Sequence, residues 1–164
     1  MEKTIENLRE AFAGESQANR RYLAFAAKAE EEGYPQVARL FRAAAEAETI
    51  HAHNHLKALK AVKGTADNLK EAIEGETAEF RDMYPAMIAA AQAEGQKEAE
   101  RTFFYANEVE KVHAELFKKA LETLEEKKLV ELFICPVCGY TVEGEPPESC
   151  PICKTLKKFF RRID

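Results

Sequence analysis

The sequence predicts a mainly α-helical protein in which a four-helix bundle is followed by a small cysteine-rich module. Abundant Ala, Glu, Lys and Leu, with only seven Gly and six Pro among 164 residues, favour helices over sheet. Apolar residues recur at helical spacing in four long segments. All four cysteines follow residue 134, in two Cys-x-x-Cys pairs. The chain is long enough for one medium domain and a small second domain that needs a disulfide or a metal ion to be stable.

Each of the four helical segments ends at a glycine or at a change of composition. The expected helices cover residues 4–32, 36–63, 68–94 and 97–128. The first three stop at Gly33, Gly64 and Gly95, since glycine commonly ends a helix. Past Leu129 a β-branched and apolar stretch leads into the cysteines. We therefore expect two domains, a helical bundle over residues 1–129 and a tetracysteine domain over residues 130–164.

The helical part contains an internal repeat. Gly14-Glu15-Ser16 recurs as Gly75-Glu76-Thr77, at an offset of 61 residues. Further matches, at an offset of 62, are Gly33 with Gly95, Phe41 with Phe103, Glu48 with Glu110 and His51 with His113. Each half is thus expected to be a helical hairpin, with a Glu on its first helix and a Glu-x-x-His on its second.

The repeat predicts a site for two metal ions. Residues three apart share a helix face, so each Glu-x-x-His projects toward one point. The expected ligands are Glu15, Glu48, His51, Glu76, Glu110 and His113. This set matches di-iron carboxylate bundles and suits iron or manganese. A single Glu-x-x-His is usually a solvated face, but two copies at repeat spacing favour the metal. Glu79, one turn beyond Glu76, is a candidate seventh ligand.

Two tyrosines and two further histidines lie close to these ligands in sequence. Tyr22 follows Glu15 by seven residues, so its hydroxyl could hydrogen-bond a ligand carboxylate; plain core packing is the alternative. Tyr84 precedes Pro85, which should bend the third helix near the site. His53 and His55 have no counterpart in the second half and are expected to lie outside the ligand set.

The cysteines form a second metal site. Cys135, Cys138, Cys150 and Cys153 form two knuckles with 11 residues between them. In a reducing compartment such pairs indicate metal ligation rather than disulfides, and a fold this small needs its ion. Iron would make the module a one-electron relay and zinc a structural clamp; the spacing allows either.

Composition excludes several other classes. No apolar run approaches the roughly 20 residues that span a bilayer, and residues 1–10 lack a signal-peptide core. We therefore expect a cytoplasmic protein that has no membrane partner. The net charge is −5 and no basic stripe stands out, which argues against nucleic acid as a partner.

Essentially the whole chain resembles the rubrerythrin family. The matching stretches are Ala11–Gln17, Glu48-x-x-His51, Gly75-Glu76-x-x-Glu79, Met83-Tyr84-Pro85, Glu110-x-x-His113, Cys135–Tyr140 and Cys150–Cys153. The resemblance implies a ferritin-like di-iron bundle joined to a rubredoxin-like one-iron domain. It also implies a non-haem peroxidase that reduces hydrogen peroxide.

The resemblance further implies roles for individual residues. Glu48 and Glu110 would bridge the two irons, with Glu15 on one iron and Glu76 and His113 on the other. The position of Glu79 ligates the oxidised first iron in the family, and that of His51 replaces it on reduction. The implied catalytic set is therefore Glu79, His51, Tyr22 and Tyr84. Two irons would lie in the bundle and one among the four cysteines, where zinc is also possible.

The implied reaction needs hydrogen peroxide and an electron-donor protein or reductase that returns electrons through the tetracysteine iron. Two alternatives stay open at this point. One is a ferroxidase or iron-storage protein, which shares the bundle but does not need an appended relay. The other is a zinc-ribbon interaction protein with no redox chemistry.

Two features depart from the expected pattern. Lys154 follows the second knuckle where a rubredoxin usually has Gly, which strains the turn if it needs a positive φ. The linker between the second and third helices is also short. A helix of about 28 residues is roughly 42 Å long, whereas five chain steps reach at most about 18 Å. We therefore expect a homodimer that exchanges helical hairpins, with an up-and-down monomer as the alternative.

Overall fold

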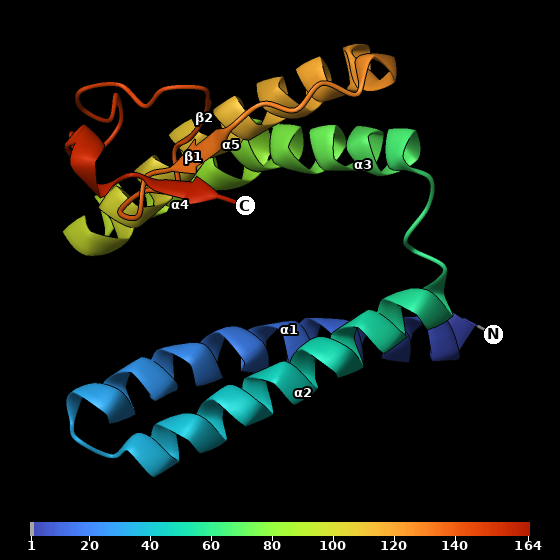
Figure 1. Cartoon of the computed structure of the whole chain (residues 1–164). Coiled ribbons are helices and arrows are strands. Elements are labelled where there is room, and N and C mark those ends of the chain that lie inside the picture. The colour runs from blue at the N-terminus through green and yellow to red at the C-terminus, as the bar shows by residue number, and fades with distance from the viewer. Residues whose placement is uncertain (1) are drawn as a thin grey trace. The chain divides into compact units, whose positions relative to one another are not determined.

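The computed structural model describes residues 2–164 and confirms the mainly helical fold class. The chain divides into two compact units, one ending at Lys63 and the other beginning at Gly64. The first is a helical hairpin, and the second combines a helical hairpin with a three-stranded sheet (Figure 1). Each unit is described separately below.

The first unit consists of α1 (Glu2–Glu31) and α2 (Pro35–Leu59), which run antiparallel (Figure 1). Gly33, at φ +81°, reverses the chain between them, as its place after the first helical segment predicts. The amide of Asn19 on α1 donates to the Ala45 carbonyl at 2.7 Å and to the Thr49 hydroxyl at 2.9 Å. Its buried residues are small: Ala18, Ala26, Ala29, Ala38, Ala45 and Ala52.

Large apolar side chains of this hairpin stay exposed. Leu23 is 42% exposed, Phe25 47%, Leu40 67% and Ile50 55%. Two helices that touch through alanine have no room between them for such side chains. The hairpin therefore carries apolar surface that a further pair of helices would cover.

The second helix ends earlier than the sequence suggests. α2 stops at Leu59 rather than at residue 63, because Lys60 adopts a left-handed conformation with φ 53°. Its N–H points back to the carbonyls of Leu56 and Lys57, which closes the last turn. Glycine usually takes this conformation, which is why the sequence predicts that the second helix stops at Gly64. The fourth helix likewise ends at residue 122 rather than 128.

The second unit begins with a helix that is interrupted once. α3 (Thr65–Ala78) passes into a π-helical turn, Glu79–Met83, and continues as α4 (Tyr84–Ala93). The Tyr84 N–H donates to the Glu79 carbonyl, five residues back. Pro85 follows and cannot donate a backbone hydrogen bond, so the wider turn lies where the proline disturbs the helical ladder. The single helix expected over residues 68–94 is thus broken beside Glu79.

Helix α5 (Lys97–Glu122) packs against α3 and α4 and then leads into the cysteine-rich module. In the module, β1 (Leu132–Ile134) lies between β2 (Thr141–Glu143) and β3 (Arg161–Ile163), antiparallel to both. Short 3₁₀ turns span Leu124–Glu126 and Lys157–Phe159. The largest fully buried side chains are Cys135 and Cys150, so the cysteines occupy the core of this small sheet.

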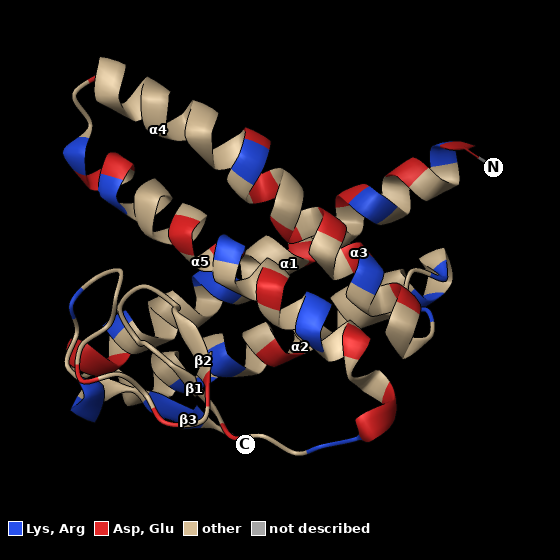
Figure 2. Cartoon of the chain, turned by 90° about the horizontal axis from the view of Figure 1, so that it is seen from above, with Lys and Arg blue, Asp and Glu red and all other residues tan. Residues whose placement is uncertain are grey.

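Positive and negative side chains are mixed along the helices of both units (Figure 2). Within the described residues, no helix combines the length and apolar character that crossing a bilayer requires.

Lys154 occupies a strained turn. Its φ is 64°, and its N–H donates to the Cys150 carbonyl at 3.0 Å, so the second knuckle does require the left-handed conformation. We expect Lys154→Gly to be more stable than Lys154→Ala by about 1 kcal/mol, because only the alanine keeps a Cβ at this φ. Both variants lose the contact from the lysine ammonium to the Pro151 carbonyl, so their difference isolates the backbone. Guanidinium unfolding of the metal-loaded protein measures it, and equal stability of the two variants would contradict the strain.

Candidate metal sites

The first unit brings together three of the predicted ligands. Nδ1 of His51 lies 2.8 Å from a carboxylate oxygen of Glu48 and 4.0 Å from one of Glu15. Glu15 comes from α1 and the other two from α2, three residues apart on one face. All three ligand atoms lie within 4.8 Å of one another, which is close enough to hold one ion.

The second unit repeats this arrangement. Nδ1 of His113 lies 2.7 Å from a carboxylate oxygen of Glu110 and 3.7 Å from one of Glu76. Their ligand atoms also lie within 4.8 Å of one another. The two groups, found in different units, therefore agree in ligand type and nearly in distance, as the internal repeat predicts.

The second group is better suited to a bound cation than to negative charges that no cation neutralises. Burial and the neighbouring Glu110 raise the pKa of Glu76 to about 7. The hydrogen bond with Glu110 raises the pKa of His113, despite its burial. Carboxylates gathered this closely repel each other, and a divalent ion would replace the shared protons. The donor set of oxygens and one imidazole fits iron.

Glu79 and Tyr84 flank the second group. Glu79 lies outside the three-ligand cluster, in the π-helical turn, but burial and the charge of Glu110 raise its pKa. The pKa of Tyr84 is raised by burial and then by the charges of Glu79, Glu110 and Glu76. The catalytic role that the resemblance implies for Tyr84 stays a prediction with this support.

The remaining candidates belong to the first unit. The Tyr22 ring packs 6.0 Å from that of Phe41 and 6.4 Å from that of Phe25, which fits the core-packing reading. A hydrogen bond from its hydroxyl to a ligand stays a prediction. Neither His53 nor His55 belongs to the candidate metal-binding groups among the described residues, and their place outside the ligand set stays a prediction.

The four cysteines converge on a second kind of site. Sγ of Cys135 lies 3.4 Å from that of Cys153, and Sγ of Cys138 lies 3.5 Å from that of Cys150. Each knuckle closes with a backbone hydrogen bond, from Gly139 to the Cys135 carbonyl at 3.0 Å and from Lys154 to the Cys150 carbonyl at 3.0 Å. The four sulfurs surround one position, as a tetrahedral metal site requires.

The thiols differ in their readiness to bind a metal. Burial alone would raise the pKa of Cys153, but hydrogen bonds from the Thr155 hydroxyl and N–H outweigh it and lower the pKa to about 6. Burial raises the pKa of Cys138 and of Cys150. Cys153 therefore ionises more readily than Cys138 and Cys150, and cation binding displaces the protons that those two thiols keep.

A contact that sequence reasoning missed joins the two kinds of site. Nε2 of His113 lies 3.1 Å from the Thr141 hydroxyl on β2, and Gly139 approaches the Val109 side chain, where an added Cβ would lie 3.8 Å away. The module therefore packs on α5 beside the second carboxylate group. Nothing in the pattern around Thr141 signals this, because the contact depends on how the sheet docks.

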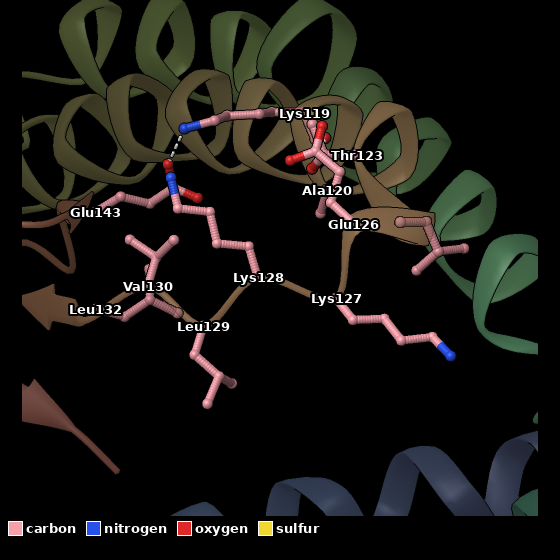
Figure 3. Close-up of a pocket in the computed structure, with 11 residues that line it drawn as sticks. Lys119, Ala120, Thr123, Glu126, Lys127, Lys128, Leu129, Val130, Leu132 and Glu143 are labelled. Carbon is pink, nitrogen blue, oxygen red and sulfur yellow. Dashed lines mark hydrogen bonds and ion pairs between the residues drawn. The ribbon is translucent and has the colours of Figure 1, made fainter.

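A groove elsewhere in the second unit lies apart from this chemistry. It runs between the end of α5 and the segment that leads to β1 (Figure 3). Lys119 pairs with Glu143 there, while Leu129 and Val130 lie along its edge (Figure 3). It contains none of the predicted ligands, so we do not assign the chemistry to it.

Comparisons with known proteins agree with this geometry. The Rubrerythrin family profile matches residues 6–121, and the profile described as "Rubrerythrin, rubredoxin-like domain" matches residues 133–161. Rubrerythrin-2 of Clostridium acetobutylicum is 44% identical over 175 residues, covering 96% of this chain and 95% of that protein. Nigerythrin of Nitratidesulfovibrio vulgaris is 39% identical, with 96% and 85% covered. The domain boundary expected between residues 129 and 130 stays a prediction, and it falls between the two matched segments.

Solved structures point the same way. A structure of nigerythrin in a mixed-valence state superimposes with a TM-score of 0.61 at 39% identity, covering 98% of this chain and 86% of that one. Another is titled as the fully reduced, all-ferrous state of nigerythrin. The carboxylate and histidine groups are accordingly candidates for a di-iron site, and the four cysteines for a rubredoxin-like iron site.

The raised pKa of Glu76 predicts a pH-dependent stability in the metal-free protein. A carboxyl whose pKa rises from 4.5 to about 7 on folding stabilises the fold below pH 4.5, and this contribution is lost as the pH rises to about 7. Glu76→Gln, which mimics the protonated carboxyl, should therefore stabilise the metal-free protein at pH 8, by about 1 kcal/mol after solvent screening, and have little effect at pH 4. Urea unfolding at both pH values tests this. With metal bound the variant should be the less stable form, and a stabilisation that persists with metal would count against a ligand role.

Proposed function

This chain belongs to the rubrerythrin family of di-iron proteins, and we propose that it is a peroxidase that reduces hydrogen peroxide to water. One observation carries the proposal: a tetracysteine module contacts the histidine of a carboxylate group that occurs twice in the chain. Two equivalent metal positions suit a two-electron reaction, and a one-iron module beside one of them suits stepwise supply of electrons.

In this proposal each carboxylate group holds one iron. The residues are Glu15, Glu48 and His51 for the first iron and Glu76, Glu110 and His113 for the second. Glu48 and Glu110 are the proposed bridges, as the family resemblance implies. When both irons are ferrous, they supply the two electrons that convert one peroxide and two protons into two waters.

Three residues beside the ligands have proposed roles in changing the ligand set and in hydrogen bonding to the ligand carboxylates. As the family resemblance implies, Glu79 would hold the first iron when it is oxidised and His51 would hold it when it is reduced. Glu79 lies in a π-helical turn, which gives its backbone a geometry unlike that of a regular helix. Burial and the charges of Glu79, Glu110 and Glu76 raise the pKa of Tyr84, so its hydroxyl keeps its proton and is the proposed hydrogen-bond donor to a ligand carboxylate. Tyr22 is proposed for the corresponding role in the first unit.

The tetracysteine iron is the proposed relay between an external donor protein or reductase and the bundle. The four cysteines are free thiols in the structure, which suits a reducing compartment, and we propose the cytoplasm. A ferroxidase or storage function would leave the docking of this module beside His113 without a purpose. We therefore favour the peroxidase.

We further propose that the active unit is a homodimer with exchanged hairpins. Each unit supplies three ligands, half of the six that a di-iron carboxylate bundle uses. α2 has 25 residues and is roughly 37 Å long, whereas the chain from Leu59 to Thr65 reaches at most about 22 Å. That linker cannot run back along α2, as a ferritin-like crossover requires. A hairpin from a second copy avoids the crossover and covers the exposed Leu40 and Ile50.

Stopped-flow oxidation tests the peroxidase proposal. The fully reduced, iron-loaded protein should react with hydrogen peroxide much faster than with dioxygen. Glu110→Ala should lose at least about 100-fold in this rate, because it removes a proposed bridge. His53→Ala, an exposed histidine outside the ligand groups, is the matched control and should keep the wild-type rate. A reduced protein that prefers dioxygen, or that retains iron far above three ions per chain, would contradict the proposal.

Complementation tests the exchange of hairpins. Glu48→Ala disables the first ligand group and Glu110→Ala the second, so each variant alone should be inactive. In an exchanged dimer that contains one copy of each, one bundle combines both intact groups. Co-refolding the two variants in equal amounts should therefore restore about a quarter of wild-type activity, if pairing is random.

Without exchange every bundle carries one defect, and no activity returns. Light scattering of the metal-loaded wild type gives an independent measure, since a monomeric mass would also rule out the exchange.

A further inference from the structure

The Thr141 hydroxyl stands between the tetracysteine loop and the second carboxylate group. It donates to the Gly139 carbonyl at 3.1 Å and lies 3.1 Å from Nε2 of His113. A hydroxyl has one proton, and here Gly139 accepts it. The hydroxyl oxygen can therefore accept a hydrogen bond from His113 in the tautomer that carries its proton on Nε2, and the Gly139 backbone also hydrogen-bonds His113.

This arrangement selects the form of the imidazole that binds a metal. With the proton held on Nε2, Nδ1 keeps its lone pair when a metal is bound. Nδ1 is the atom that faces the carboxylates, at 2.7 Å from Glu110 and 3.7 Å from Glu76. The hydroxyl thus orients the ring and fixes its tautomer, as supporting hydrogen bonds do for metal-bound histidines generally.

The same hydroxyl is anchored in the module. Thr141 begins β2 and pairs with Ile134 of β1, the residue before Cys135. Gly139, which accepts its proton, follows Cys138 directly and lies against Val109 of α5. A continuous path of bonds and hydrogen bonds therefore runs from the Cys138 backbone through Gly139 and Thr141 to His113.

His113, which contacts the Thr141 hydroxyl of the module, is the less exposed of the two histidines. The His113 side chain is 27% exposed, whereas that of His51 is 53% exposed, although their ligand distances nearly match. The geometry of the two groups follows from the repeat, but the support of His113 comes from outside it, from a strand that the repeat does not contain.

We propose that Thr141 is a positioning residue that orients His113 for metal binding and couples the tetracysteine site to the carboxylate site of the same chain. The coupling rests on the proposed function, whereas the orientation does not. With iron in both sites, this path would let one electron at a time pass from the tetracysteine site to the ion held by His113, the first being oxidised and the second reduced. Two passages replace the two electrons that one peroxide and two protons consume in forming two waters.

Two substitutions separate the hydroxyl from the fold. Thr141→Val keeps the shape of the side chain and removes the hydroxyl, whereas Thr141→Ser keeps the hydroxyl. The first readout is cobalt(II) binding to the carboxylate sites, followed by the metal's visible absorption. Thr141→Val should weaken binding at one of the two positions about tenfold, and Thr141→Ser should stay within about twofold of wild type.

The second readout is the oxidation of the tetracysteine iron after the fully reduced protein is mixed with hydrogen peroxide. Thr141→Val should slow the appearance of the ferric thiolate colour about tenfold or more, with Thr141→Ser again close to wild type. The initial oxidation of the bundle by peroxide should continue in both. Equal behaviour of the valine and serine variants in both readouts, whether slowed or unchanged, overturns the proposal. A wild type inert to peroxide would instead refute the peroxidase function, and the cobalt readout would still decide the role of Thr141 in orientation.

Discussion

Carboxylates gathered on neighbouring helix faces repel one another unless a cation lies among them, and the helical part of this chain is arranged around that constraint. Each unit places two glutamates and a histidine within 4.8 Å of one another. Without metal, burial and the charge of Glu110 make it costly to ionise Glu76, and they raise its pKa to about 7. In the first unit, alanine contacts between α1 and α2 keep the two helices close enough for their carboxylates to converge. The packing of α1 on α2 and the convergence of the ligands therefore depend on each other, and a bound ion stabilises both.

The cysteine-rich module also depends on a bound cation, which its four sulfurs would hold. Its three strands have three residues each, and its largest fully buried side chains are Cys135 and Cys150. The ion accordingly takes the place that apolar side chains hold in a larger domain, and folding and metal binding become one equilibrium. The module packs on α5, where the Thr141 hydroxyl lies 3.1 Å from Nε2 of His113, so it contacts the second carboxylate group directly. The two metal sites are thus linked through structure as well as through their proposed chemistry.

The features that could be predicted from the sequence are those set by local geometry. Residues three apart share a helix face, so Glu48 with His51 and Glu110 with His113 lie together in the structure, and their role as ligands stays a prediction. The knuckles are equally local, and the strain expected at Lys154 was confirmed by its φ of 64°. The early end of α2 was missed because Lys60 takes a conformation that glycine usually takes. The π-helical turn at Glu79 and the contact from Thr141 to His113 could not be predicted either, because both depend on packing between segments distant in sequence.

The short linker gives these local features a consequence for the assembly. The two ligand groups lie in different units, and a chain segment too short to follow α2 back along its length joins those units. If the hairpins are exchanged, the first group of each bundle comes from one copy and the second group from the other. The tetracysteine module remains on the copy that supplies the second group, because it packs on α5 of its own chain. The proposed peroxide site would then belong to both chains, whereas each proposed path for electrons would lie within one. Binding of the two irons and pairing of the chains would therefore stabilise each other, since neither half of the ligand set is complete alone.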